Sequence, residues 1–263
     1  MKKYFKSIIH NLPYIRRLRK NLFSLSDNLY DSKMKGHKIL LELAKYKIQL
    51  NVLNEVEDYE LLIFLELKFG GYITNVTPTI KDKEFLKKSP SLHTGGDRFN
   101  PFYHDYSGMY SKYLHNLRNN KIKLLEVGIL KGTGLAVWSK YFNDVDIYGF
   151  DWDLGIINAN LDNLISLGAF QKNKPKLFQY NQLINNQQWL EDNFSDIKFN
   201  VIIDDALHTD KAIINTFSEI QPYLSDDFVY FIEDNTSAFK KLEKKYPEYH
   251  FDNEGELTVV TKK

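Results

Sequence analysis

The stretch from Leu124 to Gly134 constrains the fold more than any other part of this 263-residue chain. It reads LLEVGILKGTG: an apolar run carries Glu126 near its end, and three glycines follow before a helical pattern begins. Glycine lets the backbone turn sharply and approach a ligand closely, and the helix start presents free N–H groups. A second apolar run ends at Asp151, whose carboxylate can accept hydrogen bonds from a ribose diol. We therefore expect a strand–turn–helix unit that binds an adenosine-type ligand.

Strand and helix patterns alternate along the chain from residue 123 onward. The predicted strands are 123–127, 146–150, 176–179, 200–203, 228–232, 249–252 and 257–261. The predicted helices between them are 133–142, 155–167, 182–193, 209–224 and 237–245. Such alternation requires a mainly parallel sheet with helices on both faces, and the last two strands form a hairpin. We predict an α/β, Rossmann-like, doubly wound sheet of seven strands, one of them antiparallel.

Composition excludes several classes of function. The net charge of +1 argues against a general nucleic-acid binder, which would carry a basic excess. The chain has no cysteine, so disulfides, thiolate metal sites and cysteine nucleophiles are excluded. No apolar run approaches the ~18 residues that span a bilayer, and basic residues interrupt any signal-peptide core near the N-terminus. We therefore expect a cytoplasmic protein.

Acidic side chains follow two of the predicted strands. Asp204 and Asp205 come directly after strand 200–203, and Glu233 and Asp234 follow strand 228–232. Since the carboxyl ends of parallel strands meet at one edge of a sheet, these acids lie on the same edge as the glycine turn. Converging carboxylates repel one another unless a cation lies between them. Hard divalent ions prefer oxygen ligands, so we expect Mg2+ or Mn2+ held by Asp205, Glu233 and Asp234.

His208 stands three residues beyond Asp205, within reach of a hydroxyl bound at that ion. An imidazole with an unperturbed pKa of ~6.5 suits a general base near neutrality, and the ion would ease loss of the hydroxyl proton. The alternative is that each of these acids only caps the helix that follows it. The D-x-x-H and E-D pairs occurring together favour the metal site.

The glycine spacing identifies the type of cofactor by resemblance. A nicotinamide fingerprint, G-x-G-x-x-G, needs glycine where Leu130 stands. The frame that fits is E-x-G-x-x-x-G-x-G, made by Glu126, Gly128, Gly132 and Gly134. It resembles the first motif of class I S-adenosylmethionine-dependent methyltransferases. The resemblance implies that S-adenosyl-L-methionine is the cofactor.

The two acidic motifs narrow the resemblance to one family. The sequences IIDDALH at 202–208 and FIED at 231–234 resemble the I-I-D-D-G-S-H and V-I-E-D motifs of metal-dependent sugar O-methyltransferases, which act on macrolide and tetracenomycin deoxysugars. The resemblance covers residues 91–263 and gives His208, Asp205, Glu233 and Asp234 the roles described above. The expected cofactor contacts are Glu126, Gly128, Gly132, Gly134, Asp151, Trp152, Asn181, Gln182 and Asp204.

A segment upstream of the sheet also resembles this family, in which it lies over cofactor and substrate. The resemblance implies substrate contacts from Arg98, His104 and Tyr106. The chain departs from the family's motifs at three places: Ala206-Leu207 replaces Gly-Ser, Asn181 replaces an acid, and Arg98 replaces lysine.

Residues 1–90 lie outside the resemblance and read as helices at 4–23, 35–53 and 59–69. We predict a helical N-terminal region of residues 1–90, for packing, oligomerisation or substrate cover, and a catalytic, S-adenosylmethionine-binding domain of residues 91–263. Packing of the basic first helix on this domain, or on a second copy in a homo-oligomer, is favoured over contact of residues 1–23 with a membrane surface.

The sequence therefore predicts a divalent-metal-dependent O-methyltransferase that uses S-adenosylmethionine to methylate a sugar hydroxyl. The sugar would be nucleotide-activated, part of a surface polysaccharide, or part of a natural-product glycoside. A nicotinamide-dependent sugar oxidoreductase is one alternative, although it gives the carboxylates no task. A non-catalytic partner subunit with the methyltransferase fold is another, although it does not need the D-x-x-H and E-D pairs.

Overall fold

The computed structural model describes residues 57–70, 96–101, 103–172 and 174–263. These residues belong to two units, of which the first ends at Lys112 and the second contains Tyr113–Lys263. The helices predicted at 4–23 and 35–53 lie outside the described residues, as does the predicted boundary at residue 90. The division into 1–90 and 91–263 stays a prediction, as do the roles proposed for the N-terminal region.

The second unit is built on a seven-stranded sheet with the order β3-β2-β1-β4-β5-β7-β6. The strands are β1 (Lys121–Val127), β2 (Asp144–Asp151), β3 (Lys176–Gln179), β4 (Phe199–Asp204), β5 (Leu224–Ile232), β6 (Tyr249–Glu254) and β7 (Leu257–Lys262). Strands β1 to β5 pair in parallel, while β7 is antiparallel to both β5 and β6. The predicted seven-stranded sheet with one antiparallel strand is confirmed.

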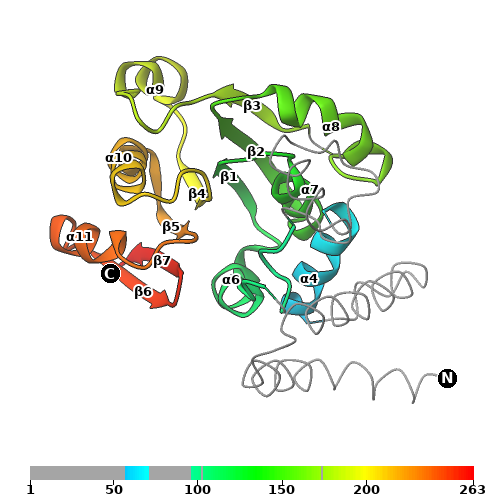
Figure 1. Ribbon diagram of the computed structural model, residues 1–263, viewed down its shortest axis with the longest axis horizontal. Helices are drawn as coiled ribbons and strands as arrows, with labels where there is room; N and C mark the ends of the chain where they lie inside the picture. The colour runs from blue at the N-terminus through cyan, green and yellow to red at the C-terminus, as the bar shows by residue number, and fades with distance from the viewer. Residues whose placement is uncertain (1–56, 71–95, 102, 173) are drawn as a thin grey trace, which may run out of the picture. The chain divides into compact units, whose positions relative to one another are not determined.

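Helices cover both faces of this sheet. Figure 1 shows α7 (Thr133–Tyr141) and α8 (Gly155–Ser166) on one face, and α9 (Gln187–Phe194), α10 (Asp210–Ile220) and α11 (Ala238–Lys245) on the other. Shorter elements are α6 (Ser107–Leu114) and the single-turn helices η2 (His115–Leu117) and η3 (Gln221–Tyr223). The predicted doubly wound arrangement is therefore confirmed.

An aromatic core fixes the sheet against α9 and α10. The ring of Phe150 in β2 lies 5.3 Å from that of Phe194 in α9, and the ring of Tyr230 in β5 lies 5.0 Å from that of Phe217 in α10. Aromatic pairs bury large apolar areas and prefer defined geometries. The strand ends that follow Phe150 and Tyr230 are thereby held in place, and these ends carry the predicted site residues.

The helix predicted at 182–193 is wrong at its start, because α9 begins only at Gln187. The preceding segment is held by side-chain amides instead of helical hydrogen bonds. Asn181 Oδ1 accepts a hydrogen bond from Leu183 N, and Asn186 Nδ2 donates to the carbonyl oxygens of Asn181 and Ile184. Amide side chains compete in this way with backbone hydrogen bonding. The result is an irregular loop after β3 that leads toward the site.

The first unit contains α4 (Asp58–Phe69), which confirms the helix predicted at 59–69. Glu66 is buried in α4, and its Oε2 accepts a hydrogen bond from Phe99 N at 2.9 Å. Burial raises the pKa of Glu66 to about 8, and the nearby charge of Asp97 adds to the rise.

No helix in the described part of the chain is long and apolar enough to cross a membrane.

Candidate functional site

The glycine turn connects β1 to α7 and lies against the loop that follows β4. Gly128 has a φ of +90°, and a Cβ added there would collide with the backbone of Asp205 and Ala206. Asp205 N also donates a hydrogen bond to the carbonyl oxygen of Val127 at 2.9 Å. Only glycine combines this φ with so close an approach. The glycine turn and the loop after β4 are therefore in direct backbone contact.

Glu126 lies beneath the start of α7. Its carboxylate is buried and accepts a hydrogen bond from Trp138 Nε1 at 3.1 Å, and a Cβ at Gly134 would collide with it. A carboxylate near the first turn of a helix is favoured by the helix dipole. Glu126 thus supports the turn from inside, and its predicted contact with a cofactor stays a prediction.

Asp151, at the end of β2, anchors the glycine turn. Its Oδ2 accepts hydrogen bonds from Ile129 N at 2.9 Å and Leu130 N at 3.0 Å, and its Oδ1 accepts one from Asp153 N at 3.1 Å. A carboxylate has about four acceptor positions, so these three bonds leave capacity for a ligand hydroxyl. The structure therefore brings Asp151 and the turn together, as the sequence predicts.

Three further predicted cofactor residues follow β2 and β3, in different environments. Trp152 is 72% exposed, so its ring is available to a ligand. Asn181 is also exposed, with its Oδ1 used by the backbone of its own loop. Gln182 is only 5% exposed, and its amide is bonded within the protein. The contacts of these three residues with a cofactor stay predictions.

Asp204, the last residue of β4, is buried below the site. Its Oδ1 accepts a hydrogen bond from Gln182 Nε2 at 2.8 Å, while its Oδ2 has no hydrogen-bond partner among the described residues. Burial raises the pKa of Asp204 to about 7, although the bond from Gln182 opposes the rise. Its predicted cofactor contact stays a prediction, since the described contacts of this carboxylate are internal.

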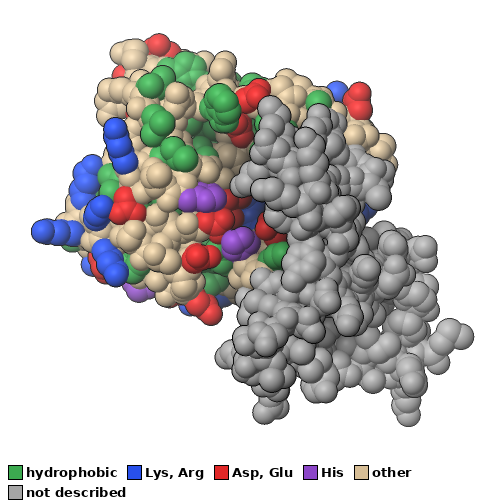
Figure 2. Space-filling view, in the orientation of Figure 1, with side chains coloured by type: hydrophobic (Ala, Val, Ile, Leu, Met, Phe, Trp, Pro, Cys, Tyr) green, Lys and Arg blue, Asp and Glu red, His purple; other side chains and the backbone are tan. Residues whose placement is uncertain are grey.

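Asp205, His208 and Asp234 form a cluster at the carboxyl edge of the sheet. His208 Nε2 lies 3.3 Å from Asp205 Oδ1, and His208 Nδ1 lies 3.8 Å from Asp234 Oδ2. The hydrogen bond with Asp205 raises the pKa of His208, and partial burial opposes the rise. Figure 2 shows acidic side chains (red) beside a histidine side chain (purple) on the face toward the viewer. Residues from the ends of two different strands are thus brought together, as predicted.

The donor set of this cluster fits a hard divalent cation. One ligand atom from each of Asp205, His208 and Asp234 lies within 4.8 Å of the others, and two of the three are carboxylate oxygens. Oxygen donors at this separation suit Mg2+ or Mn2+. Among the described residues, this group does not include Glu233, which is 2% exposed and donates its N–H to the carbonyl oxygen of Asp204 at 3.0 Å. A metal contact from Glu233 stays a prediction.

Asp234 adopts a backbone conformation that is uncommon for a residue with a side chain. Its φ is +53°, in the left-handed region. The next residue is tied down, because Asn235 N donates to the carbonyl oxygen of Glu256 at 3.0 Å. Residues held in such conformations cluster at functional sites, where the surrounding structure imposes them. This turn directs the Asp234 carboxylate toward His208 and Asp205.

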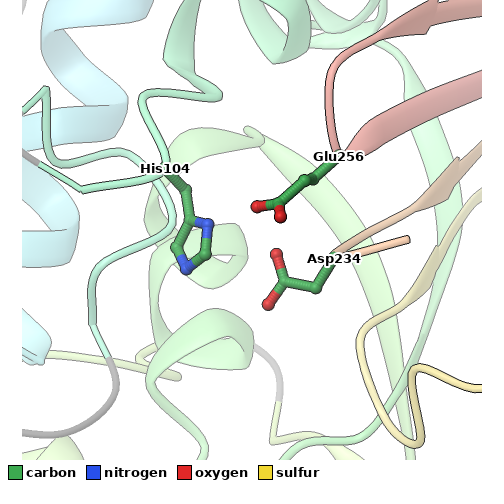
Figure 3. Close-up of side chains that lie close together, drawn as sticks. All are labelled: His104, Asp234 and Glu256. Atoms are coloured by element: carbon green, nitrogen blue, oxygen red, sulfur yellow. The ribbon is translucent and has the colours of Figure 1, made fainter. Parts of the chain in front are cut away.

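Glu256 joins the site although the sequence did not single it out. Figure 3 shows its carboxylate, from the turn between β6 and β7, facing that of Asp234, and the two carboxylates approach within 4.8 Å. His104, the third residue labelled there, belongs to the first unit. Antiparallel pairing of Ile232 with Thr258 brings Glu256 level with Asp234. The strand register between β5 and β7 is the signal that would have revealed Glu256.

Asn235 is a second residue that the sequence did not single out. Its Nδ2 donates to the carbonyl oxygen of His208 at 3.0 Å and to Asp210 Oδ1 at 3.1 Å. Its Oδ1 accepts from the N–H groups of Ser237 and Ala238 at the start of α11. Asn235 therefore ties the loop that carries His208 to the following helix.

The predicted substrate residues lie together in the first unit. Tyr106 N donates to the carbonyl oxygen of Arg98 at 3.0 Å, and the rings of His104 and Tyr106 are 5.2 Å apart. His104 Nε2 lies 3.8 Å from Asp97 Oδ2. Arg98, His104 and Tyr106 therefore share one folded segment, and their contact with a substrate stays a prediction.

Sequence comparison relates the chain to a known methyltransferase. No protein-family model matches the chain. The chain is similar to the L-olivosyl-oleandolide 3-O-methyltransferase of Streptomyces antibioticus, with 24% identity over 144 residues that cover 52% of this chain and 34% of that protein. The chain thus spans about a third of the length of this curated relative. This similarity confirms the predicted resemblance to sugar O-methyltransferases.

Solved structures show the same architecture. The MycE methyltransferase from the mycinamycin biosynthetic pathway, in complex with Mg and SAH, matches with a TM-score of 0.50 and 17% identity, over 72% of this chain and 55% of MycE. Its complex with Mg, SAH and mycinamycin VI matches with the same values. These similarities confirm the Rossmann-like methyltransferase fold.

Proposed function

We propose that this chain is an S-adenosylmethionine-dependent, divalent-metal-dependent O-methyltransferase that acts on a sugar hydroxyl. One observation carries the proposal: the glycine turn packs backbone to backbone against the loop that bears Asp205 and His208. A cofactor held by the turn and a hydroxyl held at the cluster would therefore be neighbours. Methyl transfer requires such proximity of donor and acceptor.

The cofactor would be held by the turn and by the ends of β2 and β3. The N–H groups at the start of α7 and the glycines Gly128, Gly132 and Gly134 would cradle it, with Glu126 supporting the turn from below. The Asp151 carboxylate would accept a hydrogen bond from a ribose hydroxyl while keeping its hydrogen bonds from the turn. The exposed ring of Trp152 would lie against the adenine, and Asn181 would contact its edge.

The metal-binding side chains and His208 would act on the sugar hydroxyl. Asp205 and Asp234, with Glu233 as a third predicted ligand, would hold Mg2+ or Mn2+. When bound, the ion eases ionisation of a coordinated hydroxyl, and S-adenosylmethionine supplies the methyl group. His208 would take the hydroxyl proton on its imidazole. The proton thus leaves the oxygen that gains the methyl group.

The sugar substrate is proposed from the relatives and from the motifs. The Streptomyces relative is named for L-olivosyl-oleandolide, and MycE was solved with mycinamycin VI. For this chain the acceptor would be a nucleotide-activated sugar, a surface polysaccharide or a natural-product glycoside. A carboxylate that the motifs do not include, Glu256, adjoins the cluster and could accept a hydrogen bond from such a sugar.

The test is transfer of a radiolabelled methyl group from S-adenosylmethionine to a panel of these acceptors. We expect transfer that EDTA abolishes and Mg2+ restores. His208→Ala should lower kcat about 10^2–10^4-fold, because a general base contributes that much. The same variant should keep the wild-type affinity for S-adenosylhomocysteine, since His208 is assigned no contact with the cofactor. Binding of NAD+ and not of S-adenosylhomocysteine would overturn the proposal in favour of an oxidoreductase.

A further inference from the structure

Gln182 joins the loop after β3 to the loop after β4 through a buried side chain. Its Nε2 donates to Asp204 Oδ1 at 2.8 Å and to Thr216 Oγ1 at 2.7 Å, and its Oε1 accepts from Leu207 N at 2.8 Å. Both hydrogens of the amide nitrogen are therefore used, as is the amide oxygen. Since the side chain is 5% exposed, these three bonds form away from bulk water.

The partners of Gln182 differ in how firmly they are fixed. Asp204 ends a central strand, and Thr216 lies inside α10, where its hydroxyl donates to the carbonyl oxygen of Ala212 at 3.0 Å. Leu207, in contrast, belongs to the loop between β4 and α10, and it directly precedes His208. The amide therefore connects two rigid elements to the short loop that carries Asp205 and His208.

A second amide, that of Asn235, also holds this loop. Asn235 Nδ2 donates to the carbonyl oxygen of His208, next to the N–H that Gln182 accepts from Leu207. Asn235 also serves the start of α11, so its substitution would disturb that helix. Among the described residues, the Gln182 side chain bonds to Asp204, Thr216 and Leu207 and to no helix start, which makes it the better residue to test.

We propose that Gln182 is a positioning residue that sets the separation of Asp205 and His208 for metal binding and proton removal, and that it does not contact the cofactor. This inference rests on the proposed function. A metal-binding group depends on the bonds that orient it, and loss of such an outer bond costs about 10–100-fold in metal affinity or activity. A displacement of about 1 Å at the reacting groups costs about 10^2-fold in rate.

The test compares Gln182→Met with Asn215→Ala in the full chain. Methionine fills similar space but forms none of the three hydrogen bonds. Asn215 is a matched control, because its Nδ2 donates to the carbonyl oxygens of Gln182 and Ile184 and so holds the same segment without reaching the loop after β4. Mn2+ binding is measured by electron paramagnetic resonance, S-adenosylhomocysteine binding by calorimetry, and kcat and KM by methyl transfer.

We expect Gln182→Met to weaken Mn2+ binding by about 10–100-fold and to lower kcat by a similar factor. The same variant should keep the wild-type affinity for S-adenosylhomocysteine and the wild-type KM for S-adenosylmethionine. Asn215→Ala should match wild type in every measurement. Weaker S-adenosylhomocysteine binding with unchanged Mn2+ binding would overturn the inference and make Gln182 a cofactor ligand. Unchanged values in all measurements would also overturn it.

A second variant and the binding of both ligands by the wild type distinguish failure of this inference from failure of the proposed function. If Gln182→Met does not fold, Gln182→Glu keeps an oxygen for Leu207 N but loses the bonds donated to Asp204 and Thr216. It should weaken Mn2+ binding while binding of S-adenosylhomocysteine stays unchanged, and the reverse pattern contradicts the inference. A wild-type chain that binds neither ligand overturns the proposed function itself, whereas wild-type binding of both with an unaffected variant overturns only the role of Gln182.

Discussion

The glycine turn and the loop after β4 lie side by side at one edge of the sheet, yet they are fixed by different means. The turn is fixed by its own glycines and by Asp151, which accepts the N–H groups of Ile129 and Leu130. The loop after β4 is held by amides from elsewhere in the chain, Gln182 and Asn235. The glycines and the acid at the end of the next strand belong to a spacing pattern that can be recognised in sequence. The loop after β4 depends instead on amide partners that its own sequence motif does not contain.

The largest expected effect comes from crowding the contact between these two regions. In Gly128→Val, a β-branched side chain would meet the backbone of Asp205 and Ala206 at a φ of +90°. We expect a loss of about 4 kcal/mol or more in the free energy of unfolding, because overpacking and backbone strain combine. Urea denaturation measures this loss in the free energy of unfolding.

The matched control for this substitution is Gly255→Val, also at a positive φ, +66°, but with no atom within 4 Å of an added Cβ. It should cost only the strain of the left-handed conformation, about 1–2 kcal/mol. Equal losses for the two variants would show that the contact between the turn and the loop adds nothing.

Loss of the Asp151 carboxylate should weaken cofactor binding next most strongly. In Asp151→Asn, one charged acceptor for the N–H groups of Ile129 and Leu130 is lost. Since hydrogen bonds to charged groups contribute about 1.5–3 kcal/mol, we expect the Kd for S-adenosylhomocysteine to rise about 10–100-fold in calorimetry. Asp153→Asn is the control, because among the described residues the Asp153 carboxylate accepts from Gly155 N and not from the glycine turn. An unchanged Kd for Asp151→Asn would contradict the anchoring role.

Loss of one amide that holds the loop after β4, that of Asn235, should have a moderate effect on stability and on Mn2+ binding. Asn235→Ala removes the bond to the carbonyl oxygen of His208 and the acceptor for Ser237 N and Ala238 N. We expect a loss of about 1–2 kcal/mol in unfolding free energy, as for a lost helix cap. Weaker Mn2+ binding should accompany it, whereas the exposed neighbour in Thr236→Ala should change neither quantity. Stability loss without weaker Mn2+ binding would restrict Asn235 to capping α11.

The smallest expected effect concerns Asp210, beside Asn235. Hydrogen bonds from Lys241, Ser237 and Asn235 lower the pKa of Asp210 to about 2. A carboxyl with a lowered pKa in the folded state stabilises the protein above its unfolded pKa, and this stabilisation is lost as pH falls from about 4 toward 2. The wild type should therefore lose slightly more stability than Asp210→Asn over that range in thermal unfolding. Parallel curves would contradict this contribution.

The sequence predicted what depends on local pattern. Strand β3 has the predicted bounds, and the glycine turn, Asp151, Asp205, His208 and Asp234 meet at one edge because parallel strands end there. Periodicity and turn chemistry are local properties, so they can be read from neighbouring residues. The terminal hairpin with one antiparallel strand was also predicted, and β6 and β7 form it.

Contacts between distant segments could not be predicted in the same way. The bonds of the Gln182 amide to Asp204 and Leu207 were not predicted, because they arise in the irregular segment before α9. Glu256 depends on the register between β5 and β7, which no single segment specifies. Side-chain amides bond to whatever the fold brings near, so their partners follow from tertiary structure alone.

The most direct test of the account asks whether the two regions bind their ligands next to each other. S-adenosylmethionine with an isotopically labelled methyl group is bound to the chain, and its methyl NMR signal is followed while Mg2+ is replaced by Mn2+. Because Gly128 packs against Asp205, we expect paramagnetic Mn2+ to broaden the signal and EDTA to restore it. Asp205→Asn combined with Asp234→Asn should abolish the broadening. A bound methyl signal that stays sharp at saturating Mn2+ would contradict a shared site.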